Sequence, residues 1–184
     1  MSGLKEVLRN RSSSRIHDEK LKRSAVVVPA YYDDERGGHG VLLMRRSDDL
    51  PRHAGQISFP GGRMESDDSG LAETALRELH EEVGMPPEKV DLLGTLDDVT
   101  TTTAYSIRPY VGCISYPYSF EIQESEVAEL IHAPVSDLTH PSVYEKRYKN
   151  GRDVHYFHYE DYTIWGATAR ILAQFLELAY DWSP

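Results

Sequence analysis

The stretch that decides the fold is GLAETALRELHEEVGM, residues 70–85. Its apolar residues recur every four positions, which is the spacing of one face of an α-helix: Leu71, Ala75, Leu79 and Val83. Gly84 stands where a left-handed glycine commonly ends a helix, and the two prolines that follow Met85 prevent continuation. The sequence therefore predicts an amphipathic helix over residues 70–83.

This helix carries three glutamates within little more than one turn: Glu78, Glu81 and Glu82. Like charges at helical spacings of three or four cost about 0.2–0.5 kcal/mol per pair. Arg77 can reach Glu81, but one guanidinium cannot neutralise three carboxylates. Sites of several carboxylates are what Mg²⁺ or Mn²⁺ prefers, so the cluster predicts a divalent metal site. An ordinary solvated acidic face is the alternative that spacing alone leaves open.

Composition sets the wider limits. The chain has 184 residues, of which 40% are hydrophobic and 27% charged, as in one ordinary folded domain. The single cysteine cannot form an internal disulfide, and no apolar run is long enough to span a bilayer, so we expect no membrane partner and a cytoplasmic location. A net charge of -10 repels polyanions, so nucleic acid is not expected as a partner. A phosphate substrate would need local arginines or bound cations.

The organisation of the chain is that of a layered α/β domain. We expect an N-terminal arm over residues 1–22, a short helix and a mobile segment, followed by a single domain over residues 23–184. A hairpin is predicted around Asn150-Gly151, because this pair is a strong turn signal, and a last helix over residues 166–180. The remaining strands are predicted at 24–32, 41–46, 90–99, 105–115 and 127–135. Strands precede the first long helix in the sequence, and further strands and a last helix follow it. This order favours an α/β/α arrangement with a mixed central sheet.

At residues 77–85 the sequence resembles a known family. RELHEEVGM matches the core REUxEExGU of the Nudix hydrolase box, in which U is an apolar residue. Gly62 precedes Arg77 by one residue more than is usual, and Asp68 stands where the early glutamate would fall when counted from Gly62. Residues 42–47 (LLMRRS) and 50–62 (LPRHAGQISFPGG) are similar to the signature of coenzyme A pyrophosphatases within that family, and residues 164–172 resemble their closing segment.

The resemblance implies a Nudix-like α/β/α sandwich with its catalytic helix after a Gly-rich loop. It also implies that Glu78, Glu81 and Glu82 bind Mg²⁺ or Mn²⁺, with the carbonyl of Gly62 as a further ligand, and that Arg77 orients the carboxylates. The activity it implies is hydrolysis of the diphosphate bond of coenzyme A or its thioesters, giving 3′,5′-ADP and 4′-phosphopantetheine or its acyl form. In such chemistry bound metals neutralise the phosphates and activate water.

Substrate contacts are expected near the Gly-rich loop. The candidates are Gly61 and Gly62 with the arginines Arg45, Arg52 and Arg63, since a 3′-phosphate and a diphosphate need guanidinium donors. Ordinary surface charge is the alternative for each arginine. Glu126 is the candidate general base, and Glu124 is the next choice.

Other functions stay open at this point. Within enzymes the alternative is a Nudix pyrophosphatase for ADP-ribose or a damaged nucleotide. Outside enzymes the alternatives are a catalytically silent nucleotide-binding module and a structural cation-binding domain. In each case the expected partner is a small molecule, and the chain is expected to be a monomer or a homodimer.

Overall fold

A mixed sheet forms the centre of the computed structural model, which describes residues 2–149 and 151–183. Its middle strands, β1 (Lys22–Asp33) and β7 (Tyr105–Cys113), pair in parallel, and every other pairing in the sheet is antiparallel. The strand order is β3-β2-β1-β7-β5, with β4 also on β1, β6 on β7 and β8 on β2. The bounds of these strands are β2 Gly38–Arg46, β3 Ile57–Ser58, β4 Gly61–Arg63, β5 Asp91–Thr95, β6 Val99–Thr100 and β8 Val127–Pro134.

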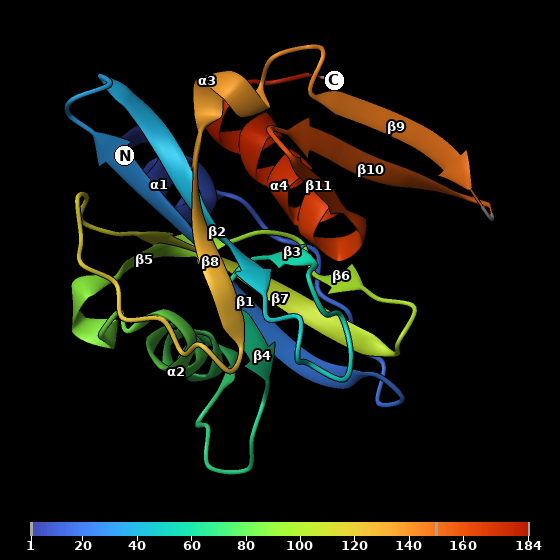
Figure 1. The fold of residues 1–184 in the computed structure, drawn as a ribbon. Helices are drawn as coiled ribbons and strands as arrows, with labels where there is room; N and C mark the ends of the chain where they lie inside the picture. Colours follow the sequence, from blue (N-terminus) through green and yellow to red (C-terminus); the bar gives the residue numbers. More distant parts are fainter. Residues whose placement is uncertain (1, 150, 184) are drawn as a thin grey trace.

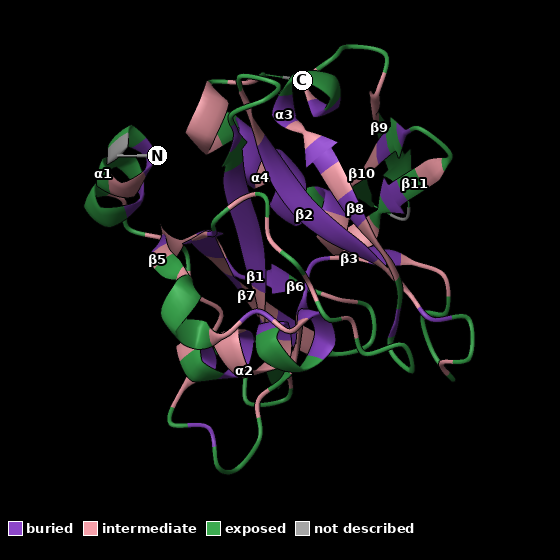
Figure 2. Cartoon of the chain, turned by 60° about the vertical axis from the view of Figure 1, so that its left-hand side comes forward, coloured by how far each residue is buried: buried purple, intermediate pink, exposed green. Residues whose placement is uncertain are grey.

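Helices cover both faces of this sheet, as Figure 1 shows. The helix α2 (Leu71–Val83) packs on one face, and α4 (Gly166–Tyr180) lies on the other. Side chains of a strand alternate between faces, so Ala25 and Val27 of β1 join the core beneath α2, whereas Val28 and Ala30 join the core beneath α4. The central strands are accordingly buried on both sides (Figure 2). The predicted α/β/α sandwich with a mixed sheet is confirmed.

A second, smaller sheet stands beside α4. It consists of β9 (Tyr144–Lys149), β10 (Arg152–Tyr159) and β11 (Tyr162–Trp165), in the order β11-β10-β9. The predicted hairpin is therefore present, although Asn150 of its turn lies outside the described residues. The third strand was not predicted. Two short helical turns complete the chain, the 3-10 helix η1 (Pro87–Lys89) and α3 (Val135–Leu138).

The predicted strand over residues 90–99 is wrong as a single element. It is divided into β5 and β6, and Asp98 between them turns inward with 5% of its surface exposed. Its carboxylate accepts hydrogen bonds from Arg108 (3.0 Å), Arg15 (3.3 Å) and the backbone N–H of Ile16 (3.0 Å). Because a buried carboxylate needs such donors, the strand breaks where Asp98 meets them.

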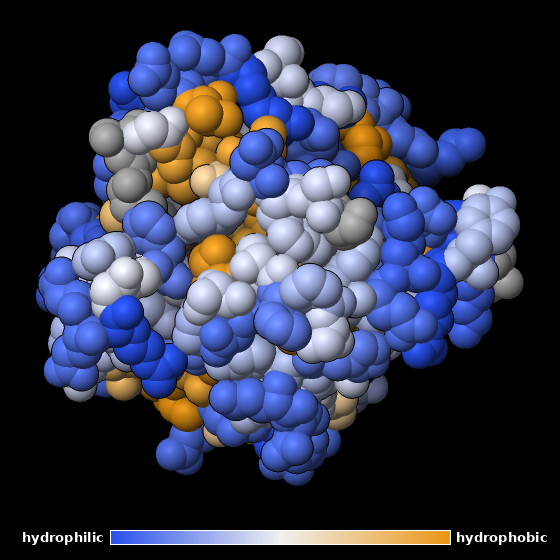
Figure 3. All heavy atoms as spheres, turned by 90° about the horizontal axis from the view of Figure 1, so that it is seen from above, coloured by the Kyte–Doolittle hydropathy of each residue, from blue (hydrophilic) through white to orange (hydrophobic). Residues whose placement is uncertain are grey.

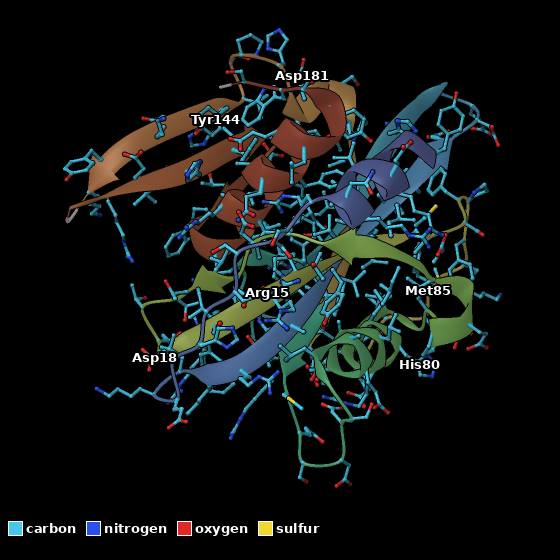
Figure 4. The ribbon with its side chains drawn as sticks, turned by 180° about the vertical axis from the view of Figure 1, so that it is seen from behind. Arg15, Asp18, His80, Met85, Tyr144 and Asp181 are labelled. Carbon is cyan, nitrogen blue, oxygen red and sulfur yellow. The ribbon has the colours of Figure 1, made fainter. Side chains whose placement is uncertain are left out.

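The N-terminal segment packs against the domain. Its helix α1 (Ser2–Asn10) buries Leu4 and Leu8 in the core beneath α4. The chain that follows, which carries Arg15 (labelled in Figure 4), is tied to the loop after β5. Arg11 bonds Asp97 at 2.7 Å, and Arg15 bonds Asp98 at 3.3 Å. The expected helix is present. The expected mobility of residues 1–22 stays a prediction, and these contacts argue against it. No helix among residues 2–149 and 151–183 is long and apolar enough to cross a membrane.

Candidate active site

Two glycines bring the sheet against α2. Gly61 and Gly62 lie on β4, which pairs with Ala25 and Val26 of β1. Gly61 has a φ of 152°, and a Cβ atom there would overlap the carbonyl oxygen of Ala25. A Cβ atom on Gly62 would overlap the carboxylate of Glu78. Position 61 therefore requires glycine, because of its positive φ and its approach to the β1 backbone, whereas a side chain at Gly62 would displace the carboxylate of Glu78.

Glu82 is the most buried acid of the site, with 2% of its surface exposed. The N–H of Gly61 donates to Glu82 Oε2 at 2.8 Å, and Arg46 Nη1 lies 3.7 Å from Oε1. Burial raises the pKa of this carboxyl to about 8, and the neighbouring charge of Glu78 raises it further while the Gly61 N–H opposes the shift. Glu82 is thus a buried acid whose charge Arg46 offsets only in part, because burial outweighs the attraction.

Glu78 and Glu81 share the guanidinium of Arg77. Arg77 Nη1 lies 3.0 Å from Glu78 Oε1 and 2.8 Å from Glu81 Oε2. The Glu78 side chain is 15% exposed, and burial raises its pKa, with the charge of Glu81 acting in the same direction and that of Arg77 opposing it. Glu81 is 56% exposed. The three acids are therefore neighbours, as the helical spacing predicted, and Arg77 stands between two of them.

Asp68 holds Arg77 in this position. Its carboxylate accepts from Arg77 Nε at 3.0 Å and Nη2 at 3.2 Å, and also from the Thr74 hydroxyl at 2.9 Å and the Glu65 N–H at 2.8 Å. The hydrogen bonds from Arg77 hold the pKa of Asp68 at about 2, well below its usual range. Arg77 Nη2 also donates to the carbonyl of Arg63 at 3.2 Å. Asp68 therefore fixes the guanidinium that contacts Glu78 and Glu81.

The donor set fits a divalent cation in chemistry. Three carboxylates, two of them with pKa values raised by burial, meet beside a glycine backbone, and a cation would offset their repulsion. Among residues 2–149 and 151–183, no three His, Cys, Asp or Glu side chains already converge in metal-holding geometry. Because Arg77 Nη1 contacts Glu78 and Glu81, these side chains must turn away from it before three of them can share one cation.

Glu126 lies just before β8, and its side chain is exposed. Its negative charge helps to raise the pKa values of both Glu78 and Glu82, so it is near them in space. The Ser47 N–H donates to the Glu126 carbonyl at 2.8 Å, which fixes this position against the end of β2. Glu124 is exposed in the preceding turn. The structure thus brings Glu126 to the acidic cluster from a separate part of the chain.

A cleft of about 640 Å³ opens on the other side of the two glycines. Gly61 and Gly62 line it together with Arg46, Arg52 and Arg63. The acids of α2 do not line this cleft, but Gly61 and Arg46, which contact Glu82, do. The wall opposite the glycines is formed by β6, by the β9–β10 hairpin and by the first residues of α4.

Arg45 does not line the cleft, unlike the other two arginines that were predicted to bind substrate. Its Nε donates to Glu129 at 2.6 Å and its Nη1 to Asp48 at 2.9 Å. Successive side chains of a strand point to opposite faces, so Arg46 reaches Glu82 while Arg45 points to the other side. Arg46, the next residue of β2, is therefore the strand arginine that both lines the cleft and contacts Glu82.

Comparison with known proteins identifies the family. The model of the NUDIX domain matches residues 21–138, which is more than half of the chain. The chain belongs to the Nudix family. Among curated Nudix proteins it is 37% identical over 167 residues to the "Uncharacterized Nudix hydrolase NudL" of Citrobacter koseri, covering 87% of this chain and 85% of that protein. It is 41% identical over 139 residues to the NudL of Pectobacterium atrosepticum, covering 73% of this chain and 72% of that one.

Solved Nudix structures agree in fold. A MutT/nudix family protein from Enterococcus faecalis superposes with a TM-score of 0.58 at 14% identity, covering 98% of this chain and 74% of that one. RenU, a Nudix hydrolase from M. smegmatis, gives a TM-score of 0.54 at 20% identity, covering 66% of this chain and 78% of its own. At these identities the likeness shows the shared Nudix fold alone.

Several residues of the candidate site and of the cleft were not found by sequence reasoning. The hydrogen bonds between Asp68 and Arg77 were missed, although the position of Asp68 relative to Gly62 marked it as a candidate. The cations on the far wall of the cleft, Lys149, Arg152 and Arg170, were also missed. They lie more than 80 residues beyond Gly62 in the sequence, and no local spacing connects them to the glycine turn.

Proposed function

We propose that this Nudix hydrolase cleaves the diphosphate bond of coenzyme A or its thioesters, with Mg²⁺ or Mn²⁺ as cofactor. The products are 3′,5′-ADP and 4′-phosphopantetheine or its acyl form. The observation that carries the proposal is the buried, under-neutralised Glu82 beside Glu78, directly behind the glycine turn of a cleft that Arg46, Arg52 and Arg63 line. The resemblance of residues 42–62 to the coenzyme A pyrophosphatase signature supports coenzyme A or its thioesters as the substrate among nucleoside diphosphate derivatives.

In this proposal Glu78, Glu81 and Glu82 would hold the cation together with the Gly62 carbonyl. When bound there, the cation would supply positive charge to the diphosphate and would make a water molecule more acidic. Asp68 and Arg77 act as positioning residues, because Asp68 fixes the guanidinium that orients Glu78 and Glu81. Arg52 and Arg63 bind the phosphates at the glycine end of the cleft.

Glu126 accepts the proton of the attacking water. Its side chain is exposed, so a water molecule can reach it, and it lies near Glu78 and Glu82. A general base contributes about 10²–10⁴-fold to a reaction of this kind. Glu126→Gln should therefore lower kcat by a factor in that range and leave the substrate Kd nearly unchanged.

The direct test is product analysis with coenzyme A and Mg²⁺ in ¹⁸O-labelled water. Appearance of 3′,5′-ADP and 4′-phosphopantetheine, with the label on one of them, supports the proposal and identifies the phosphorus attacked. Intact coenzyme A alongside consumption of ADP-ribose or a damaged nucleotide would overturn the substrate assignment in favour of another Nudix pyrophosphatase.

The matched variants are Glu82→Gln and Glu88→Gln. Glu82→Gln removes a proposed metal ligand. Loss of a residue that only supports a metal ligand lowers activity by roughly 10–100-fold, so loss of the ligand itself should lower kcat/KM by more than that. Glu88 lies in η1, outside the acidic cluster, so its variant should keep full activity. Equal activity of both variants would contradict the proposed role of Glu82 as a metal ligand. Absence of hydrolysis of any diphosphate by the wild type would favour the catalytically silent module, and Mg²⁺-dependent thermal stabilisation without such hydrolysis would favour a structural cation site.

The cytoplasmic location and the state of monomer or homodimer stay predictions. Sedimentation of the purified chain distinguishes the two oligomeric states.

A further inference from the structure

The lining of the cleft is strongly basic although the whole chain is acidic. The sequence has 30 Asp and Glu against 20 Lys and Arg. In the cleft this balance is reversed, because the lining residues include one acidic residue, Asp153, and six basic residues. The basic residues are Arg46, Arg52, Arg63, Lys149, Arg152 and Arg170. A concave surface with this excess of positive charge attracts an anion.

Most of these cations have no acidic partner. Arg46 contacts Glu82, but the other five make no ion pair within 4.0 Å in the described part of the chain. Several arginines outside the cleft are paired, as Arg108 is with Asp98 and Arg147 with Glu145. Five cations without an ion pair among the described residues therefore line this one cleft, although other unpaired cations, such as Arg23 and Lys146, lie outside it. The five form two groups, one with Gly61 and Gly62 and one on the opposite wall.

We call the second group the hairpin end of the cleft: Lys149, Arg152, Tyr156, Trp165 and Arg170. Lys149 and Arg152 flank the hairpin turn, Tyr156 and Trp165 are paired in register on β10 and β11, and Arg170 lies in the first turns of α4. Figure 1 shows the hairpin and β6 on opposite sides of the start of α4. Hydrophilic residues dominate the hairpin side of the surface in Figure 3.

An aromatic surface accompanies these cations. Trp165 is 48% exposed, and it lines the cleft with Tyr156. An exposed tryptophan beside unpaired guanidinium groups suits a ligand that has a flat aromatic ring as well as negative charge, since bases stack on such side chains in a wide range of sequence contexts. A nucleobase that carries a phosphate on its sugar combines these two properties.

We propose that the hairpin end binds the nucleoside 3′-phosphate half of the substrate. The base stacks on Trp165, and Arg152 and Arg170 bind the 3′-phosphate with help from Lys149. The orientation of the ligand rests on the proposed function, because it places the diphosphate at the glycine end. The pantetheine arm then leaves the cleft from the glycine end, away from the hairpin. Selection for the 3′-phosphate is thus assigned to residues outside both the Nudix box and the upstream signature.

The test measures binding of the product half alone, without metal. Calorimetry with 3′,5′-ADP and with 5′-AMP compares ligands that differ only in the 3′-phosphate. The wild-type chain should bind 3′,5′-ADP more tightly, and the double variant Arg152→Ala/Arg170→Ala should lose about 10- to 100-fold of that preference, the range for a lost charge-assisted hydrogen bond. Its affinity for 5′-AMP should change less than about twofold.

Lys146→Ala is the matched control, since Lys146 is an exposed base on the same hairpin that does not line the cleft. It should keep the wild-type preference. Binding of 3′,5′-ADP should also quench tryptophan fluorescence in the wild type but not in Trp165→Phe, which keeps Trp182 as its other tryptophan. Equal affinity of the wild type for the two nucleotides, or equal loss in the double variant and in Lys146→Ala, would overturn the proposal.

These readouts separate the subsite from the activity. If coenzyme A is not hydrolysed but 3′,5′-ADP still binds better than 5′-AMP through Arg152 and Arg170, the proposed function fails and the subsite stands. Hydrolysis of coenzyme A would instead allow a comparison of KM for coenzyme A with KM for dephospho-coenzyme A. If the ratio of these two KM values is the same in the double variant as in the wild type, the subsite fails and the activity stands.

Discussion

Glu82 is the residue in which burial and charge are most strongly opposed. Its side chain is almost fully enclosed, it receives one backbone N–H from Gly61, and its pKa is raised to about 8. Near neutral pH without metal, much of this group is protonated. A cation bound to the cluster needs the ionised form, so metal binding and proton release from Glu82 are linked.

The pKa of Glu82 predicts how the metal-free chain responds to pH. A carboxyl whose folded pKa is raised from 4.5 to about 8 stabilises the fold fully below pH 4.5, and this stabilisation is lost as pH rises through 8. The free energy of unfolding should therefore fall between pH 5 and pH 8 more steeply in the wild type than in Glu82→Gln. Urea unfolding in chelator at several pH values measures this, and parallel profiles for the two chains would contradict the shifted pKa.

Asp68 gives a second prediction at the same scale. Asp68→Asn keeps the size of the side chain but removes the charge that holds Arg77, so the guanidinium loses its fixed place beside Glu78 and Glu81. The loss of such a supporting partner costs about 10–100-fold in metal affinity or activity. Titration of activity with Mn²⁺ should show this decrease, whereas Asp67→Asn, an exposed neighbour, should behave as the wild type.

Among the elements, α2 and β4 decide the geometry of the site together. The helix supplies the acids, but β4 sets their distance from the cleft through Gly61 and Gly62. In Gly61→Ala the new methyl group would overlap the Ala25 carbonyl at a backbone angle that side chains rarely adopt. Strain of this kind costs about 1–3 kcal/mol. Denaturant unfolding should show that loss, and activity should fall as well because the N–H that bonds Glu82 moves.

Gly151→Ala is the comparison for that variant. It also replaces a glycine of positive φ, but its site is open, lies in the hairpin turn and is far from α2 in the sequence. It should lose stability without loss of kcat. If Gly61→Ala likewise kept full kcat, the glycine turn would not position the acids.

The elements that the sequence predicts correctly are those with a strong local pattern. The four-residue period of Leu71, Ala75 and Leu79 predicts α2, and the left-handed Gly84 that ends it is confirmed with a φ of 70°. The acidic cluster follows from helical spacing alone. The two short strands β3 and β4 have no such period. They are strands because β3 pairs with β2 and β4 pairs with β1, and not because their own residues favour a strand.

Contacts between distant segments account for the rest. The role of Arg46 rather than Arg45 depends on which face of β2 lies toward α2, and the irregularity at the end of this strand is not readable from the sequence. The division of the predicted strand at Asp98 depends on Arg15 and Arg108, which come from either side of it in the chain. Such features depend on the tertiary fold, so local propensity does not predict them.

For the molecule as a whole, the N-terminal helix is part of the core. Leu8 is 4% exposed and packs beneath α4, and its neighbour on β5 is Gly94, where a Cβ atom would approach Leu8. Leu8→Ala should lower the free energy of unfolding by about 2–5 kcal/mol, the range for leucine removed from a core. Thermal or urea unfolding measures this change.

Val7→Ala is the control, because Val7 is 43% exposed on the same helix. It should change the stability by less than about 0.5 kcal/mol, as surface substitutions commonly do. Equal stability of Leu8→Ala and Val7→Ala would mean that residues 1–22 are the mobile arm that the composition suggested.

The glycine turn of β4 contacts the acids of α2 proposed to bind metal, and it also lines the cleft that leads to the hairpin end proposed to bind ligand. Because the residues of the hairpin end come from β9, β10, β11 and α4, and the acids come from α2, substitutions in the hairpin end leave the acids in place. Substitutions in the hairpin would then change which ligand a related chain prefers, while its diphosphate hydrolysis stayed the same.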